Sequence, residues 1–136
     1  MTQFIDWDDS WTFLQASAAD IDSTAVADAA QLTSDELSLD GYAGAEIGVA
    51  SVEDNTGACD GDVTVYVLGY GATGWQTIDD SLHIGDTIDQ DQNATMRAHF
   101  VVDADRYSSF KVLVDNQCGQ EVAISIKYKR SQFGSS

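Results

Sequence analysis

The fold is decided by residues 109 to 128, which read SFKVLVDNQCGQEVAISIKY. Phe110, Val112 and Val114 occupy every second position of the first half. The second half repeats this alternation with Val122, Ile124, Ile126 and Tyr128. Alternation with a period of two is typical of half-buried antiparallel strands, and the turn-forming residues 116 to 120 join the two runs. The stretch therefore predicts a β-hairpin.

The same alternation occurs upstream, at residues 45 to 49, 62 to 70 and 95 to 102. A long acidic connection, residues 71 to 94, is expected to hold one more short strand around residues 83 to 88. The chain has no Pro, and no amphipathic helix is evident in its second half. These features predict an all-β protein, an antiparallel β-sandwich or small jelly roll, with Phe100 and Phe110 inside an aliphatic core.

A chain of 136 residues is long enough for one domain with its own core and too short for two ordinary domains. We expect the β-sandwich to span residues 37–130. Residues 1–36 are expected to form an N-terminal arm and an irregular segment, and residues 131–136 a C-terminal tail.

Charge divides the chain into two parts. Residues 1 to 96 contain nineteen acidic residues and no Lys or Arg, whereas residues 97 to 136 contain all six basic residues and four acidic ones. A field this negative repels phosphates and anionic headgroups, which disfavours nucleic acids and membranes as partners. The bias is either a solubilising coat or a means of selecting a partner, and both interpretations stay open.

The N-terminus shows neither a secretory signal nor a membrane span. It lacks a basic region followed by an apolar one, so we expect synthesis in a cytoplasm. The longest uncharged stretch, residues 63 to 78, is too short and too polar to cross a bilayer as a helix.

Large apolar residues crowd the start of the chain and do not follow the sandwich periodicity. Such residues near a terminus are often anchors that are buried against a partner. A strand or plug added to the chain's own sandwich explains them equally well. The predicted partner-binding residues are Phe4, Ile5, Trp7, Trp11, Phe13 and Leu14.

Catalytic motifs are absent from the sequence, so we expect no enzyme activity and no cofactor. Only two histidines occur, His83 and His99, and both are expected on the surface. A zinc site lacks the required paired spacing. Calcium is the remaining metal alternative, but the loop that begins at Asp89 departs from the EF-hand pattern at its sixth and twelfth positions. A calcium loop of another kind stays open as an alternative, either there or at the other Asp-rich loop, Asp54 to Asp62. No residue is assigned as a metal ligand.

Two cysteines, Cys59 and Cys118, allow at most one disulfide bridge. A reducing cytoplasm favours free thiols, and their spacing matches no metal or redox motif. A strand near residues 83 to 88 would place both cysteine loops at the same end of the sandwich, where a bridge becomes feasible.

Trp75 and Tyr70 flank Gly-rich sequence and suggest a second function, a sugar-stacking platform. Under this alternative the chain is a carbohydrate-binding or receptor-binding β-sandwich module. The competing explanation is structural, with Trp75 covering an open end of the sandwich or a subunit contact.

A resemblance to a known family is carried by four stretches, residues 37 to 49, 62 to 68, 106 to 116 and 122 to 128. Together they resemble the small β-sandwich decoration, or cement, proteins of tailed-bacteriophage capsids. The resemblance implies a virion structural protein that folds in the host cytoplasm and then binds the outer capsid surface. It further implies a homo-oligomer, commonly a trimer, that stabilises the shell by bridging subunits of the major capsid protein. A tail or connector accessory protein is a further alternative.

Overall fold

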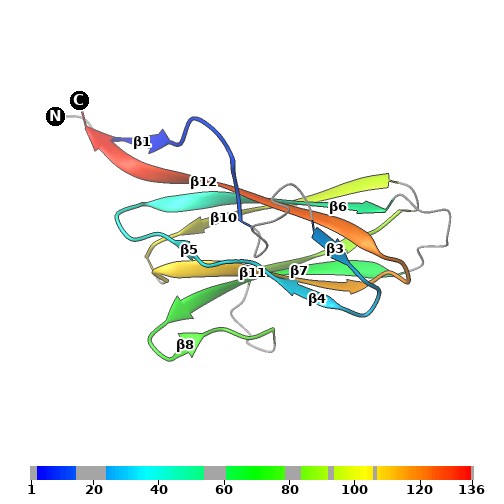
Figure 1. Ribbon diagram of the computed structural model, residues 1–136. Helices are drawn as coiled ribbons and strands as arrows, with labels where there is room; N and C mark the ends of the chain where they lie inside the picture. Colours follow the sequence, from blue (N-terminus) through cyan, green and yellow to red (C-terminus); the bar gives the residue numbers. More distant parts are fainter. Residues whose placement is uncertain are drawn as a thin grey trace.

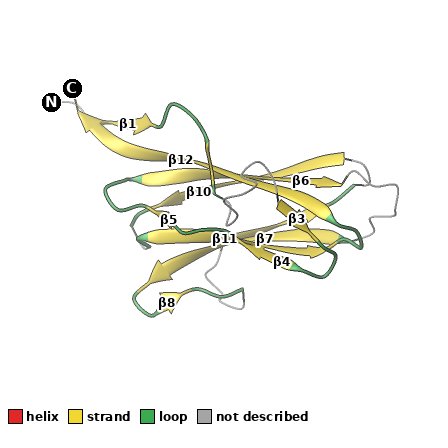
Figure 2. Cartoon of the chain, viewed as in Figure 1, coloured by secondary structure: helices red, strands yellow, loops and turns green. Residues whose placement is uncertain are grey.

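Two antiparallel sheets face each other in the computed structural model (Figure 1). The structure describes residues 3–14, 24–53, 61–78, 84–91, 94–105 and 107–135. All regular structure in these residues is β-strand, which Figure 2 shows directly. The predicted antiparallel β-sandwich is therefore confirmed.

Sheet A has the strand order β1-β12-β6-β10, and two short strands, β2 and β3, also pair with β12. The long strand β12 is thus flanked by β6 on one side and by the N-terminal strands on the other. The strands of sheet A are β1 (Gln3–Trp7), β2 (Thr12–Phe13), β3 (Thr24–Val26), β6 (Gly44–Glu53), β10 (Ala94–Asp103) and β12 (Val122–Ser135).

Sheet B has the strand order β4-β11-β7-β8, with β5 paired to β11 and β9 paired to β7. Its strands are β4 (Gln31–Thr33), β5 (Leu37–Ser38), β7 (Asp62–Gly71), β8 (Gly74–Trp75), β9 (Ile84–Asp89) and β11 (Ser109–Gln117). The strand predicted around residues 83 to 88 corresponds to β9.

The core lies between the sheets and is built from the alternating residues that the sequence predicted. Phe100 and Phe110 are both buried within it, as expected. Burial of such side chains supplies the main favourable free energy of folding, at roughly 1.5–3 kcal/mol for each fully buried one. The other central members are Ile47, Val49, Val63, Val65, Val67, Val112, Val114, Ile124 and Ile126.

Asn116 is a buried polar residue that links the β11–β12 hairpin to the end of β3. Its side-chain amide donates to the carbonyls of Val26 and Gln120, at 3.0 and 2.7 Å, and its side-chain oxygen accepts from the Cys118 amide. A buried amide with these partners avoids the free-energy penalty of an unsatisfied polar group.

The N-terminal region is more regular than expected. β1 and β2 both lie along β12, so residues 3–14 form an edge of the chain's own sheet A. β12 continues to Ser135, through the residues predicted as a tail, and the two chain ends lie together (Figure 1). Alternation was not visible here because short edge strands bury little apolar surface.

A bulge separates β1 from β2. Trp7 pairs with Ser131 and Thr12 pairs with Tyr128, so four residues, 8 to 11, lie opposite only two. The Asp8 amide donates to the Arg130 carbonyl, and the Asp8 carboxylate accepts from the Arg130 amide, both at 2.9 Å. Bulges redirect side chains at sheet edges, and this one determines where Trp11 lies.

Candidate ligand-binding site

The outward side of sheet A carries a strip of small residues between two rows of polar side chains. Gly48 and Ala50 of β6 form the strip. Residues in register across paired strands share a face of the sheet, so the outward side chains of β10 and β12 stand on either side of these two residues. Two rows run across it: Arg97, Ala50 and Ser125, then His99, Gly48 and Lys127.

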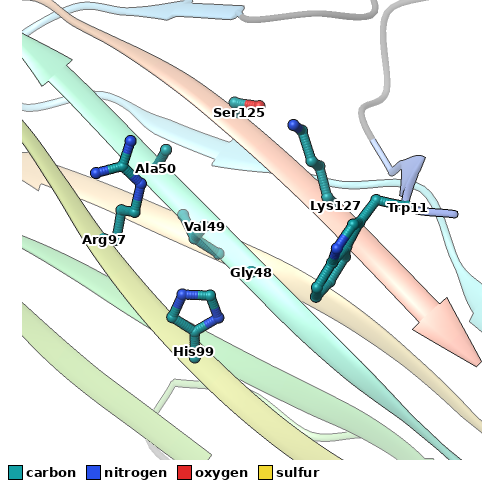
Figure 3. Close-up of a pocket in the computed structure, with 8 residues that line it drawn as sticks. All are labelled: Trp11, Gly48, Val49, Ala50, Arg97, His99, Ser125 and Lys127. Atoms are coloured by element: carbon teal, nitrogen blue, oxygen red, sulfur yellow. The ribbon is translucent and has the colours of Figure 1, made fainter.

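Trp11 reaches this strip from the bulge at the sheet edge. Its indole extends across β12 to Gly48, where an added Cβ would lie 3.9 Å from Trp11 Cζ3 and 3.5 Å from the His99 ring. Figure 3 shows Trp11 and Lys127 on one side of β6, and Arg97 and His99 on the other. Gly48 is therefore the floor between an indole and an imidazole.

The space above this floor is an open hollow of about 280 Å³. Trp11 is 38% exposed at its wall, so a ligand can contact the ring. The lining residues are Trp11, Gly48, Val49, Ala50, Arg97, His99, Ser125 and Lys127, all drawn in Figure 3. We call this space the sheet A hollow.

A second hollow, of about 410 Å³, lies further along the same strands. Trp7 and Val101 line it and are 42% and 73% exposed, which is unusual for large apolar residues. Asp103 and Asp105 also line it, so this end of the outward side is acidic.

Cations gather around the sheet A hollow, although the whole chain has a net charge of −17. Arg97, Lys127 and Lys129 point outward, and two of them lie over aromatic rings. The Lys127 ammonium is 5.0 Å from the Phe13 ring centroid, and the Lys129 ammonium is 5.4 Å from that of Trp11. These cation–π contacts hold the charges at the rim of the hollow.

Among the described residues of this part of the face, Glu46 carries a carboxylate close to His99. Its Oε1 lies 3.9 Å from His99 Nδ1, and both side chains are substantially exposed. The three permanent cations at the rim of the hollow outnumber this one acid among the described residues.

The predicted partner-binding residues are only partly brought together. Trp7 and Trp11 are exposed on the outward side of sheet A, Phe13 is half-buried, and Leu14 is buried in the core. Phe4 and Ile5 belong to β1, and the structure does not describe their side chains. Whether these residues bind a partner stays a prediction.

Alternation within residues 95 to 102 and 122 to 128 puts Arg97, His99 and Lys127 at positions opposite the apolar ones, but it does not join them into a site. They lie on strands β10 and β12, about thirty residues apart in the chain. The pairing of both strands with β6 is what brings them together. The signal that could have found them is the gathering of all Lys and Arg residues after residue 96.

Trp75 and Tyr70, the predicted sugar platform, lie on sheet B at the β7–β8 turn. Tyr70 is 46% exposed, and its ring meets Trp75 edge-on with centroids 5.2 Å apart. The Lys111 ammonium lies 4.5 Å from the Trp75 ring centroid. Lys111 therefore covers one face of the Trp75 ring, at closer range than the 5.4 Å at which Lys129 approaches Trp11.

Cys118 is buried, and its thiol donates to the Gln120 carbonyl at 3.4 Å. Gly61 donates its amide to the Cys118 carbonyl, so the chain just after Cys59 lies beside the second cysteine loop. Cys59 itself lies outside the described residues, and its pairing stays a prediction.

No group of three His, Cys, Asp or Glu residues that could hold a metal occurs in the described part of the chain. Asp89 and Asp91 are described, whereas residues 54–60 and 92–93 of the two Asp-rich loops are not, nor is His83. In the same described ranges, no helix is long and apolar enough to cross a membrane.

Comparison with known proteins finds no matching family model and no matching curated protein. Among solved structures, the crystal structure of PirA is similar, with a TM-score of 0.51 and 12% identity over 78% of this chain and 90% of that chain. At this identity the likeness shows the fold alone.

Two weaker structural likenesses are to carbohydrate-binding modules. A family 16 carbohydrate-binding module gives a TM-score of 0.46 at 9% identity, over 95% of this chain and 90% of that chain. The CBM22-1 xylan-binding domain from Paenibacillus barcinonensis Xyn10C gives 0.44 at 12% identity, over 97% and 86%.

Proposed function

We propose that this protein is a carbohydrate-binding β-sandwich module that binds its ligand in the sheet A hollow and carries out no catalytic step. The observation that carries the proposal is the exposed Trp11 indole beside a floor of Gly48 and Ala50, with hydrogen-bonding side chains around it.

Sugar chemistry matches this arrangement. A sugar ring has apolar C–H faces and a polar hydroxyl edge, so it needs an aromatic surface and hydrogen-bonding groups side by side. Trp11 offers the aromatic surface. Arg97 and Lys127 offer N–H donors, and Ser125 offers a hydroxyl that both donates and accepts.

The shape of the hollow also fits a sugar chain. It is open to solvent along the strands, and the second hollow continues on the same side of sheet A. From Ser125 to Ser131, β12 spans six residues, or about 20 Å. An extended oligosaccharide of several residues can follow this length.

A glycan array followed by isothermal titration calorimetry of the best ligand tests the proposal. Trp11→Ala is expected to weaken binding at least about tenfold, because truncating an aromatic anchor commonly costs more than about 1.4 kcal/mol. Tyr70→Ala, an exposed aromatic on sheet B, is the matched control and is expected to bind like the parent. Silence of the parent protein on the array would contradict the proposal.

Attachment to a phage capsid is a second candidate function, and one observation favours it. Trp7, Trp11 and Val101 expose large apolar surfaces on one side of sheet A, as a protein-docking surface does. The major capsid protein would be the partner, and a trimer the bound form.

Co-sedimentation with capsids tests this second candidate. Because β1 and β2 belong to sheet A, paired substitutions are a cleaner probe than deletion of residues 1–14. The parent protein is expected to sediment with capsids, and the Trp7→Ser and Trp11→Ser double variant to remain in the supernatant. Equal sedimentation of both would exclude this docking surface.

A further inference from the structure

The cations of sheet A border the hollow from both sides. Arg97 on β10 and Lys127 on β12 are each one strand away from β6 and are offset by two residues along the strands, so they stand about 12 Å apart across the strip of Gly48 and Ala50. Lys129 lies one outward position further along β12, about 7 Å from Lys127. A ligand on the strip has positive charge on two sides.

Among the described cations, Arg97 has the most freedom to bind a ligand. Its side chain is exposed and has no hydrogen bond or ion pair to any other described residue. Arg130, by contrast, stacks 4.0 Å from the Tyr42 ring centroid, and Lys111 lies over Trp75 on sheet B. The described cations away from the hollow therefore serve the chain's own packing.

From this placement we infer that the ligand in the sheet A hollow is an acidic polysaccharide whose sugar rings carry carboxylates, a polyuronate. The inference rests on the proposed carbohydrate-binding function and adds the charge of the ligand. A guanidinium matches a carboxylate with two parallel hydrogen bonds, and an ammonium contributes a point charge with three donors. Trp11 then packs against the ring that carries the carboxylate.

The number of cations favours carboxylates over dense sulfation. Three permanent cations border the sheet A hollow, Glu46 lies beside them, and Asp103 and Asp105 line the second hollow, so this face can neutralise only a few negative charges of a bound chain. A heavily sulfated chain would bring more negative charge than these groups can offset. It would also be repelled by the rest of the protein, because the whole chain has a net charge of −17.

Calorimetry with polygalacturonate and its carboxyl-reduced form tests the inference, because the two polymers share a backbone and differ in charge. Polygalacturonate is expected to bind at least about tenfold more tightly. Arg97→Gln and Lys127→Gln are each expected to weaken that binding about fivefold and to weaken binding of the reduced polymer by a smaller factor, because glutamine still hydrogen-bonds but carries no charge. Lys111→Gln removes the same charge from sheet B and is expected to change neither affinity.

The outcomes separate the two proposals. Equal affinity for the charged and reduced polymers would overturn the polyuronate inference and leave the carbohydrate-binding function standing. Dextran sulfate binding as tightly as polygalacturonate would also overturn it, because the face would then attract any polyanion. If the parent protein binds neither polymer and no arrayed glycan, the proposed function itself is overturned. Circular dichroism of each variant confirms that the fold is retained.

Discussion

The outward sides of the two sheets use the same residue types in opposite ways. On sheet B, Trp75 is held between Tyr70 and Lys111, and Leu68 is only 3% exposed. On sheet A, Trp11 stands beside Gly48 and Ala50 and leaves a hollow of about 280 Å³. An aromatic ring and a cation thus complete the packing on one sheet and border an open site on the other.

The route of each tryptophan to its sheet explains the difference. Trp75 lies in β8, which folds back on β7, so the ring packs directly on its neighbours in the hairpin. Trp11 lies in the bulge between β1 and β2, and its ring extends across β12 to a strand that has no side chain at Gly48. In the β7–β8 hairpin the side chains pack on one another and cover the sheet. In the bulge, Trp11 is directed toward Gly48, which has no side chain, so an open space remains beside the ring.

The largest expected change in stability comes from substituting Gly69, a glycine on the inward side of sheet B. A Cβ at Gly69 would lie 2.5 Å from the Tyr107 ring, which packs edge-on against Phe110 in the core. Gly69→Ala is therefore expected to lower the free energy of unfolding by about 2–3 kcal/mol, measured by urea denaturation.

The matched control for Gly69→Ala is Gly48→Ala on sheet A. There a Cβ meets only side chains at ordinary contact distances of 3.5 Å and above. Because glycine in a strand is less favourable than alanine by roughly 0.5–1 kcal/mol, this variant is expected to be at least as stable as the parent. Equal loss of stability in both variants would contradict the claim that Gly69 is tightly packed and Gly48 is open.

The next effect concerns binding. Gly48→Leu places a large side chain in the sheet A hollow and is expected to weaken binding of polygalacturonate about thirtyfold, or about 2 kcal/mol. Thermal unfolding is expected near the parent temperature, because the side chain extends into open space. Undiminished calorimetric affinity would show that the ligand lies elsewhere.

A smaller effect is expected on sheet B. Trp75→Ala removes the edge-on contact with Tyr70 and the cation–π contact with Lys111. Together these contribute about 1–2 kcal/mol, so the unfolding temperature should fall while carbohydrate affinity stays unchanged. If Trp75→Ala instead reduced the carbohydrate affinity and left the stability unchanged, Trp75 and not Trp11 would be the ligand-binding tryptophan.

The smallest effect concerns the acid beside the hollow. Glu46→Gln removes a carboxylate 3.9 Å from His99 and is expected to strengthen polygalacturonate binding about two- to threefold, or about 0.5 kcal/mol. Raising the salt concentration should abolish the gain, because exposed charges are screened. Glu121→Gln, an exposed acid in the β11–β12 turn, serves as the control, and an equal gain there would point to net charge alone.

The sequence by itself determined which residues face the core and which face solvent. Alternation fixes the two faces of each strand, so the buried Phe100 and Phe110 and the outward Arg97 and His99 followed from pattern alone. The N-terminal aromatics carried no such pattern. Their pairing with β12 depends on backbone hydrogen bonds, which leave little trace in side-chain type.

Only the tertiary structure decided which outward residues became neighbours. Gly48, Arg97 and Lys127 lie on three strands that are distant in sequence, and the hollow exists because β6 pairs with both β10 and β12 in one register. Register is set by the summed packing of the whole core and by the bulge that redirects Trp11, and no local stretch of sequence encodes either.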